Sequence, residues 1–366
     1  MIKFGVFGDG HLTNCLPYTL PGDITRKNKL INYIDFFFDT ILDEEVSFLV
    51  VPGDLAHLTS VSSNDLDLLF YFYLKVKESK IPTVFSLGNH DLDGDESILR
   101  FLNRANCLYV PGSKIFYEEN RYFSVELHKI KTEIHVINFC SHHDFLKEAR
   151  DSISKKESGI FSLLVGHVGV KGTLHGSTKS IIGVKVDDIE EIGTNHNLIV
   201  LGHHHAFQWV TPNCFYSGSV HQTRIDEIKT TPGGVIVETD GVVHEISKIE
   251  NKFSPRFVIV EDYKFKPKEI KSSIVKPVLN LDSKTEKENV EFLRRLIDAD
   301  PYYLIKPRIK KSFRIENVKS EFSAKKKLDA IIKTMKSFDY KKNEKKKLKE
   351  HIIKIWEKAK EGEYYG

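Results

Sequence analysis

The sequence predicts a mixed α/β (α+β) protein: a two-sheet β-sandwich flanked by helices, then a small α/β domain and a C-terminal helical hairpin. Three observations predict this architecture. Short runs rich in β-branched and aromatic residues alternate with helical patterns at the start of the chain. Strand candidates then recur in greater number than one open sheet needs. After about residue 250 the pattern changes, and the chain ends in Lys-rich amphipathic stretches.

The first part of the chain alternates strands and helices. We expect strands at residues 2–7, 46–51 and 83–87, and amphipathic helices at residues 29–42 and 65–77. This alternation implies right-handed βαβ units and a sheet that is covered on both faces.

The middle of the chain continues with strands, and their number favours two packed sheets. The expected strands are residues 133–139, 161–165, 197–201, 214–216 and 234–238. Residues 168–187 are rich in glycine and predict a long surface loop, a type of segment that often carries binding function.

The last part of the chain predicts a separate organisation. Residues 277–281, 286–297 and 302–309 indicate a strand, a helix and a strand, enough for a small α/β unit. Residues 323–338 and 343–360 indicate two Lys-rich helices. We therefore expect three segments, with bounds at residues 1–250, 251–312 and 313–366.

Composition excludes several classes of protein. The chain has 366 residues, of which 40% are hydrophobic and 29% charged, which argues against a disordered chain, a collagen-like repeat and a disulfide-stapled miniprotein. The four cysteines form no C-x-x-C pair, so neither a zinc ribbon nor a disulfide framework is indicated. No apolar run approaches the roughly 20 residues of a membrane span, and the N-terminus lacks the features of a signal peptide. We expect a cytoplasmic location, which would be the host cytoplasm for a viral protein.

The formal net charge of +3 hides a strong asymmetry. Residues 1–250 carry 23 Lys or Arg against 33 Asp or Glu, a net charge of −10, whereas residues 251–366 carry 31 against 18, a net charge of +13. Between residues 306 and 360, 20 basic residues face 7 acidic ones. Such asymmetry suggests separate domains with separate partners.

Metal-capable side chains follow five of the predicted strands, where α/β sheets place their ligand sites. The seven candidate side chains offer nitrogen and oxygen atoms and no sulfur, and they are too many for one tetrahedral zinc ion. They fit two metals of intermediate softness that share a carboxylate. Asp54 is the natural bridge, because Gly53 lets the backbone turn tightly. The candidate ligands are Asp9, His11, Asp54, Asn89, His167, His203 and His205.

Such a site suits chemistry at phosphorus. Two divalent ions about 3.5 to 4 Å apart can hold an attacking hydroxide and neutralise the phosphoryl oxygens in an in-line displacement. The leaving alcohol still needs a proton, for which His90 is the candidate. Asp91 could hydrogen-bond the imidazole of His90 and keep it protonated.

The remaining histidines have plainer interpretations. A lone D-x-H or G-H pair predicts little, and only the five clusters in this order favour a dinuclear site. His204 is left out of the ligand set because adjacent positions of an extended segment point to opposite sides. His142 and His143 could line the site. We expect structural or solvent-facing roles for His128, His135, His175, His196, His221, His244 and His351.

The order D-x-H, G-D, G-N-H-D, G-H and G-H-x-H over residues 1–240 resembles the calcineurin-like metallophosphoesterase superfamily. Narrower features resemble SbcD-type DNA repair nucleases of cells and bacteriophages: His57, the stretch 216–219 and the strand around residues 233–238. The resemblance implies the metallophosphoesterase fold for residues 1–250 and a capping, DNA-contacting domain for residues 251–312. It also implies that residues 320–360 of the tail bind an SbcC-type coiled-coil ATPase.

The resemblance also implies roles for single residues. Asp9, His11, Asp54 and His205 would bind one metal, and Asp54, Asn89, His167 and His203 would bind the other. The family prefers Mn²⁺, with Mg²⁺ as the alternative. His90 would be the catalytic histidine, and His57 a second histidine that faces the substrate. The family commonly dimerises, so we expect a homodimer.

Three functions follow, in order of preference. The first is a Mn²⁺-dependent DNA exonuclease and endonuclease subunit of an SbcCD-type repair complex. The second is a small-substrate phosphatase or cyclic-nucleotide phosphodiesterase, against which the basic tail and the glycine-rich loop argue. The third is a non-catalytic subunit for DNA tethering or assembly, which the complete set of candidate ligands disfavours.

Overall fold

The computed structural model describes residues 1–310, except 15, 17, 19–23, 58–61, 95, 101–113, 153–158, 262 and 281–285. The chain divides into two compact units, Met1–Arg256 and Phe257–Gly366. The predicted tail helices at 323–338 and 343–360 lie outside the described residues, so the helical hairpin and the predicted bounds of the three segments stay predictions.

The first sheet of the N-terminal unit has six strands in the order β16-β15-β1-β2-β3-β6. The neighbours from β1 to β6 pair in parallel, while β15 and β16 are antiparallel additions. Two helices connect the first three strands, as the βαβ prediction requires. The bounds are β1 (Ile2–Val6), α1 (Thr25–Asp43), β2 (Phe48–Pro52), α2 (Ser63–Ser79), β3 (Thr83–Ser86), β6 (Ile115–Phe116), β15 (Gly233–Thr239) and β16 (His244–Glu250).

The second sheet also has six strands, in the order β13-β14-β12-β9-β8-β7. Its central strands β14, β12, β9 and β8 are parallel. Two short helices follow β8 and precede β12. The bounds are β7 (Tyr122–Leu127), β8 (Thr132–Ile137), α4 (His142–Asp151), β9 (Phe161–His167), α5 (Val186–Gly193), β12 (Leu198–Gly202), β13 (Gln208–Thr211) and β14 (Cys214–Tyr216).

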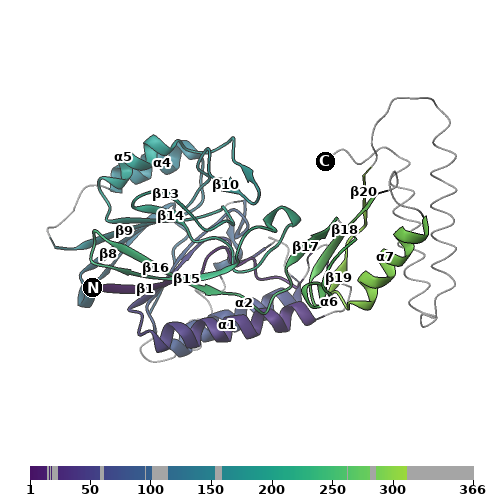
Figure 1. The fold of residues 1–366 in the computed structure, drawn as a ribbon. Coiled ribbons are helices and arrows are strands. Elements are labelled where there is room, and N and C mark those ends of the chain that lie inside the picture. The colour runs from purple at the N-terminus through teal and green to yellow at the C-terminus, as the bar shows by residue number, and fades with distance from the viewer. Residues whose placement is uncertain are drawn as a thin grey trace. The chain divides into compact units, whose positions relative to one another are not determined.

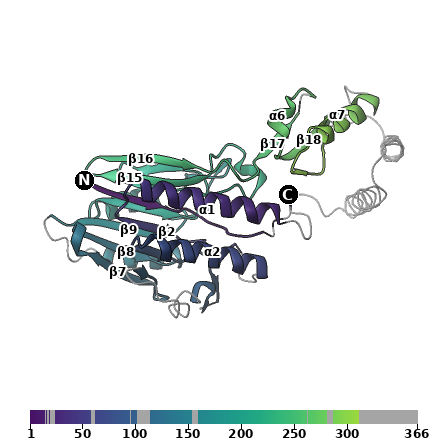
Figure 2. The ribbon, with the colours of Figure 1, turned by 90° about the horizontal axis from the view of Figure 1, so that it is seen from below.

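The two sheets pack face to face and form the centre of the unit (Figure 1). Buried side chains of both sheets, such as Phe4 and Val50 from one and Val165 and Val200 from the other, form one apolar cluster between them. Helices α1 and α2 cover the outer face of the first sheet, and α4 and α5 cover that of the second (Figures 1 and 2). The predicted fold class, a two-sheet sandwich flanked by helices, is confirmed.

Several elements were not predicted. The strands β7, β13 and β16 were missed, and so were α4 and α5, in which half of the residues are charged. The glycine-rich loop contains a small hairpin of β10 (Leu174–His175) and β11 (Thr178–Lys179). The other short elements are β4 (Leu92–Asp93), β5 (Glu96–Ser97), and the 3-10 helices η1 (Ile98–Arg100), η3 (His128–Ile130) and η5 (Ile225–Glu227).

The C-terminal unit, as far as it is described, is a small parallel sheet with helices. β18 (Ile274–Asn280) pairs with β17 (Phe257–Val260), β19 (Tyr303–Leu304) and β20 (Arg308–Lys310). The predicted single strand at 302–309 is two short strands, and Pro307, which has no N–H to donate, lies between them. The helices are α6 (Pro267–Ile270) and α7 (Glu286–Asp298), and residues such as Phe292 and Leu296 pack in the core of this unit.

None of the helices in the described ranges combines the length and the apolar character that a membrane crossing requires.

Candidate metal centre

The carboxyl ends of five strands bring the predicted ligands together. β1, β2 and β3 come from the first sheet, and β9 and β12 come from the second. Each strand runs directly into one or two of the donor residues. Asp9 and His11 follow β1, Asp54 follows β2, Asn89 follows β3, His167 ends β9, and His203 and His205 follow β12.

One half of the centre is formed around His11. Its Nε2 lies 2.9 Å from Nε2 of His205 and 3.6 Å from Oδ2 of Asp54. All three side chains are almost fully buried. These three residues are members of one of the two ligand sets that the resemblance implies.

The other half is formed around Asn89. Its Oδ1 lies 3.2 Å from Nε2 of His167 and 3.2 Å from Nδ1 of His203. Nε2 of His167 is also 3.4 Å from Oδ2 of Asp54, so this one oxygen lies close to both halves. Asp9 contacts this half, since its carboxylate accepts hydrogen bonds of 3.0 and 3.1 Å from the backbone N–H of His203.

The hydrogen-bond pattern around His167 fits a cation in this centre. Nδ1 of His167 lies 3.0 Å from the carbonyl oxygen of Pro52, which can only accept, so this nitrogen carries a hydrogen. Nε2 then directs its lone pair at the oxygens of Asn89 and Asp54, unless it too is protonated. A proton or a metal ion between these acceptors removes the conflict, and mixed nitrogen and oxygen donors suit divalent ions such as Mn²⁺. The residues present therefore fit a metal.

The pKa values show the same need for positive charge. Burial alone would lower the pKa of His167, but Asp54 and Asp9 outweigh it and raise the pKa to about 9. The pKa of His205 is likewise raised to about 9, because Glu227 outweighs the effect of burial. Burial would raise the pKa of Asp54, but His167 and His11 lower it well below its ordinary value. In the chain without metal ions, His167 and His205 therefore favour the protonated, positively charged form.

The backbone is strained where the ligands lie. His11, Asp54 and His203 have φ values of +40°, +51° and +99°, a region that residues with a Cβ rarely adopt. Two glycines make the close approach possible. A Cβ on Gly53 would lie 2.4 Å from Nδ1 of His167, and one on Gly88 would lie 2.1 Å from Oδ1 of Asp54.

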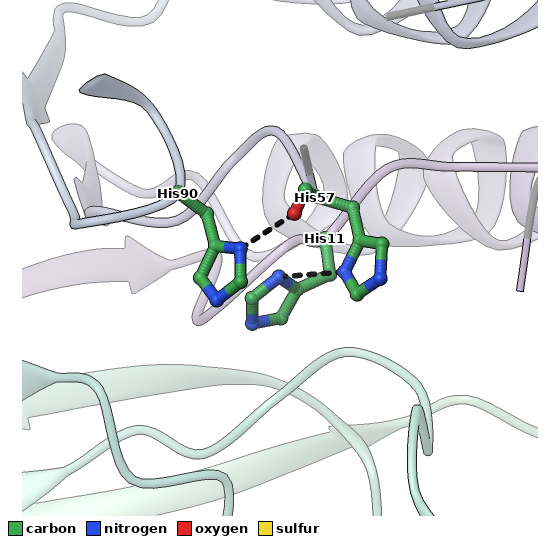
Figure 3. Close-up of side chains that lie close together, drawn as sticks. All are labelled: His11, His57 and His90. Carbon is green, nitrogen blue, oxygen red and sulfur yellow. Dashed lines mark hydrogen bonds between the residues drawn. The ribbon is translucent and has the colours of Figure 1, made fainter. Parts of the chain in front are cut away.

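His57 and His90 are partly buried and lie beside His11 (Figure 3). Their rings are nearly parallel, with centroids 5.6 Å apart. Nδ1 of His57 is 3.2 Å from Nδ1 of His11, and nitrogen atoms of the three histidines lie within 4.8 Å of one another. Burial and the neighbouring His90 lower the pKa of His57 to about 4. These three histidines could also hold a metal ion.

The predicted hydrogen bond between Asp91 and His90 is wrong. Nδ1 of His90 instead donates to the carbonyl oxygen of His57 (Figure 3). The carboxylate of Asp91 turns into the protein and accepts from the backbone N–H groups of Ala56 and Gly88, at 2.8 and 2.9 Å. Asp91 therefore braces the two turns that carry Asp54 and Asn89, rather than orienting the imidazole of His90.

Glu227 is a functional residue that the sequence did not reveal. Its Oε1 lies 2.7 Å from Nδ1 of His205, and the carboxylate also accepts from the hydroxyl and the backbone N–H of Thr223. A carboxylate behind a ligating histidine fixes the tautomer and the ring orientation. Glu227 stands 22 residues beyond His205 in η5, with no motif around it.

Among the other histidines, His175 was assigned a structural or solvent-facing role, but its ring centroid is 6.0 Å from those of both His203 and His205. The glycine-rich loop that carries His175 is the sequence feature that could have indicated its position near the centre. His204 bonds to the hydroxyl of Thr173 at 2.7 Å, which agrees with its omission from the ligand set. His142 and His143 are exposed in the first turn of α4.

Comparison with known proteins shows the family. The model of the calcineurin-like phosphoesterase family matches residues 2–207, more than half of the chain. Two similar solved structures are a dimetal phosphatase from Danio rerio and the protein TT1561 from Thermus thermophilus. The first is 11% identical, with a TM-score of 0.44, over 68% of this chain and 96% of that one. The second is 11% identical, with a TM-score of 0.38, over 68% and 99%. On the family match, this chain belongs to the calcineurin-like phosphoesterases, a family of metal-dependent phosphoester hydrolases.

Proposed function

We propose that the protein is a DNA nuclease of the SbcD type, which hydrolyses phosphodiester bonds with two Mn²⁺ ions, or Mg²⁺ in their place. The observation that carries this proposal is the pair His57 and His90. They are partly buried and lie beside His11 of the metal centre, but outside its two predicted ligand sets. Cleavage of a phosphodiester releases an alcohol that needs a proton, and an imidazole at this place can supply it.

The proposed ligand sets match the two halves of the centre except for Asp9, which contacts the half formed around Asn89. Asp9, His11, Asp54 and His205 would hold one ion, and Asp54, Asn89, His167 and His203 the other. When bound, the ions would supply electrostatic stabilisation of the charge that develops on the phosphoryl oxygens. The side-chain and backbone contacts described above hold the donors in place for this.

His90 is proposed as the general acid. Its backbone N–H donates to Oδ1 of Asp54 at 2.8 Å, which ties its position to the bridging carboxylate. Because Nδ1 donates to the carbonyl oxygen of His57, Nε2 is the nitrogen that remains for the leaving oxygen. His57 stacks against this ring and would limit its rotation.

Replacing His90 by Ala tests this role. We expect the variant to keep its metal ions and to lose cleavage by about 100-fold or more, the usual contribution of a general acid. Metal content can be measured by elemental analysis and cleavage with labelled linear DNA. His128→Ala, on a side chain that is 84% exposed in η3, is the control. Loss of a metal from His90→Ala would instead assign His90 to the ligands.

A second candidate is a phosphatase or cyclic-nucleotide phosphodiesterase with a small substrate. It is favoured by the net charge of −10 over residues 1–250, which repels a polyanion such as DNA. The basic stretch 306–360 supports the nuclease, because lysines supply phosphate contacts.

The two candidates differ in substrate preference. The purified chain with Mn²⁺ should cleave linear DNA and bis-p-nitrophenyl phosphate faster than a phosphomonoester. A preference for the monoester would contradict the nuclease. Hydrolysis of a cyclic nucleotide together with inertness towards DNA would select the second candidate.

We further propose that residues 320–360 bind an SbcC-type coiled-coil ATPase and that the chain forms a homodimer. The apolar positions on Lys-rich helical patterns support a docking role. Deleting residues 320–366 should abolish ATPase binding and leave hydrolysis of bis-p-nitrophenyl phosphate unchanged. Unaltered binding of the ATPase would refute the docking site, and sedimentation of the full chain as a monomer would refute the dimer.

A further inference from the structure

The β10–β11 hairpin is fixed next to the metal centre. The backbone N–H of Leu174 donates to Oε1 of Gln208, and Nε2 of Gln208 donates back to the carbonyl oxygen of Leu174, both at 2.7 Å. In the turn between the two strands, the hydroxyl of Ser177 donates to the carbonyl oxygen of Asp226. The hairpin is therefore attached to β13 and to η5, which both come after His203, His204 and His205 in the chain.

This attachment places His175 against both halves of the centre. Its ring centroid lies 6.0 Å from that of His203, in one ligand set, and 6.0 Å from that of His205, in the other. It is 5.2 Å from the ring of His204. His175 thus borders the centre without belonging to either proposed ligand set.

The nitrogens of His175 show an unusual arrangement. Nη1 of Arg224 lies 3.5 Å from Nε2 of His175, and a guanidinium can only donate, so Nε2 accepts and Nδ1 carries the hydrogen. Nδ1 is buried and has no hydrogen-bond partner in the described part of the chain. A buried donor without a partner destabilises a fold, so His175 does not stabilise the fold through this nitrogen.

Arg224 is the residue that benefits from this arrangement. Its side chain is 60% exposed, and its Nε lies 3.2 Å from Oδ1 of Asp226. Asp226 holds one part of the guanidinium and His175 holds Nη1, while the exposed remainder keeps further N–H groups available. A permanent cation is thereby held at the surface beside a centre that acts on phosphoesters.

We propose that Arg224, positioned by His175, binds a second phosphate of the substrate, the one next to the phosphodiester that is cleaved. The proposal rests on the proposed nuclease function, because a polynucleotide carries such a neighbouring phosphate and a cyclic nucleotide or a phosphomonoester does not. Guanidinium groups bind phosphate through paired, charge-assisted hydrogen bonds, which suits the exposed donors of Arg224.

The reacting phosphate is the less suitable target. Within the described residues, the guanidinium contacts His175 and Asp226 and none of the proposed ligands, so it reaches the centre through the ring of His175. This separation fits a phosphate that is bound but not cleaved. Arg224 and His175 would thus favour substrates long enough to carry a second phosphate. Arg224 is not a catalytic residue.

The test compares substrates with one and with several phosphates. With Mn²⁺, Arg224→Gln should raise KM for a short single-stranded oligodeoxynucleotide about tenfold more than KM for a deoxydinucleotide with a single phosphodiester. The slope of log KM against log salt for the oligonucleotide should fall by about 0.7, the value of one lost phosphate contact on a single strand. Arg121→Gln is the matched control, because Arg121 is 48% exposed and also pairs with carboxylates, Asp144 and Glu148.

The positioning role of His175 has its own test. His175→Ala should raise KM for the oligonucleotide, with a smaller effect on kcat, while His175→Gln, whose amide oxygen can accept from Arg224, should restore most of the loss. The double variant with Arg224→Gln should be no worse than Arg224→Gln alone, because the two residues act as a unit.

The outcomes separate this inference from the proposed function. If the unaltered chain cleaves the oligonucleotide and Arg224→Gln changes both KM values equally, the subsite is refuted and the nuclease stands. If the unaltered chain hydrolyses only bis-p-nitrophenyl phosphate and no DNA, the nuclease is refuted and the subsite with it. Additive effects of the two substitutions would refute the positioning role of His175.

Discussion

The N-terminal unit contains two clusters of buried histidines that differ in their partners. In the metal centre, imidazole nitrogens face carboxylate and amide oxygens or one another. In the second cluster, formed by His135 and His196, three of the four nitrogens face hydroxyls, and Nε2 of His135 faces the carboxylate of Glu133. Nδ1 of His135 lies 2.8 Å from the hydroxyl of Tyr122, and Nδ1 of His196 lies 2.9 Å from that of Ser162.

The difference shows how a binding centre can be told from a polar core. A hydroxyl can donate or accept, so the His135–His196 cluster can satisfy its nitrogens without any other species. The oxygens of Asp54 and Asn89 have no hydrogen to offer His167 in the orientation observed, and three residues of the metal centre adopt positive φ values. Acceptors that face no donor, together with backbone strain, distinguish the metal centre from the polar core, whereas the number of histidines does not.

The largest expected effect concerns Asp54. Asp54→Asn removes the charge shared by both halves of the metal centre and should lower phosphodiester hydrolysis by at least about 1,000-fold, since metal ions contribute several kcal/mol. Titration calorimetry with Mn²⁺ should show the loss of tight binding.

The contrasting variant is His196→Gln in the second cluster. It should lower the free energy of unfolding by about 1–3 kcal/mol through lost hydrogen bonds and leave Mn²⁺ affinity unchanged. Equal losses of Mn²⁺ affinity in Asp54→Asn and His196→Gln would remove the distinction between the clusters.

A smaller effect is expected behind the ligands. Glu227→Gln keeps an oxygen near Nδ1 of His205 but removes its charge, and should weaken Mn²⁺ binding by about 10- to 100-fold. The matched variant is Glu133→Gln, whose carboxylate lies 3.5 Å from Nε2 of His135. Glu133→Gln should leave Mn²⁺ affinity unchanged. If it weakened Mn²⁺ binding as much as Glu227→Gln does, Glu227 would act through its charge alone and not through its contact with His205.

The smallest effect concerns pH and the second cluster. Burial lowers the pKa of His135 below its ordinary value of 6.5, although Glu133 opposes this. The unfolded chain therefore binds a proton that the native chain does not. The stability from neutral His135 is fully present above pH 6.5 and is lost as the pH falls towards its lower native pKa.

The measurement is urea unfolding of the metal-free protein between about pH 5 and about pH 7, in which one such group contributes at most about 1.4 kcal/mol per pH unit. His135→Gln should flatten the profile in this range. An unchanged pH profile would show that the pKa of His135 is the same in the native and the unfolded chain.

The sequence predicted that the candidate ligands come together, because they share one rule. Asp9, Asp54 and Asn89 each follow a strand whose apolar residues are evident, and parallel strands deliver their carboxyl ends to one edge. Gly53 was predicted to permit a tight turn, and it has a φ of +97° beside His167.

The errors arose where no local pattern exists. Asp91 follows His90 directly, but neighbours in a turn point in different directions, and only the folded chain shows that Asp91 faces Ala56 and Gly88. Glu227 reaches His205 from a separate turn, so no spacing in the sequence indicates it. The helices α4 and α5 escaped prediction because they are short, and few of their residues are buried.

The origin of the ligands from two sheets has a mechanical consequence. Asp54 follows β2 of one sheet, and His167 ends β9 of the other, so ions held by both would act as a reversible cross-link across the open end of the sandwich. Such a link joins chain positions more than 100 residues apart, and closing so long a loop restricts the unfolded chain more than the native one. The supply of metal would then govern the lifetime of the folded protein as well as its turnover.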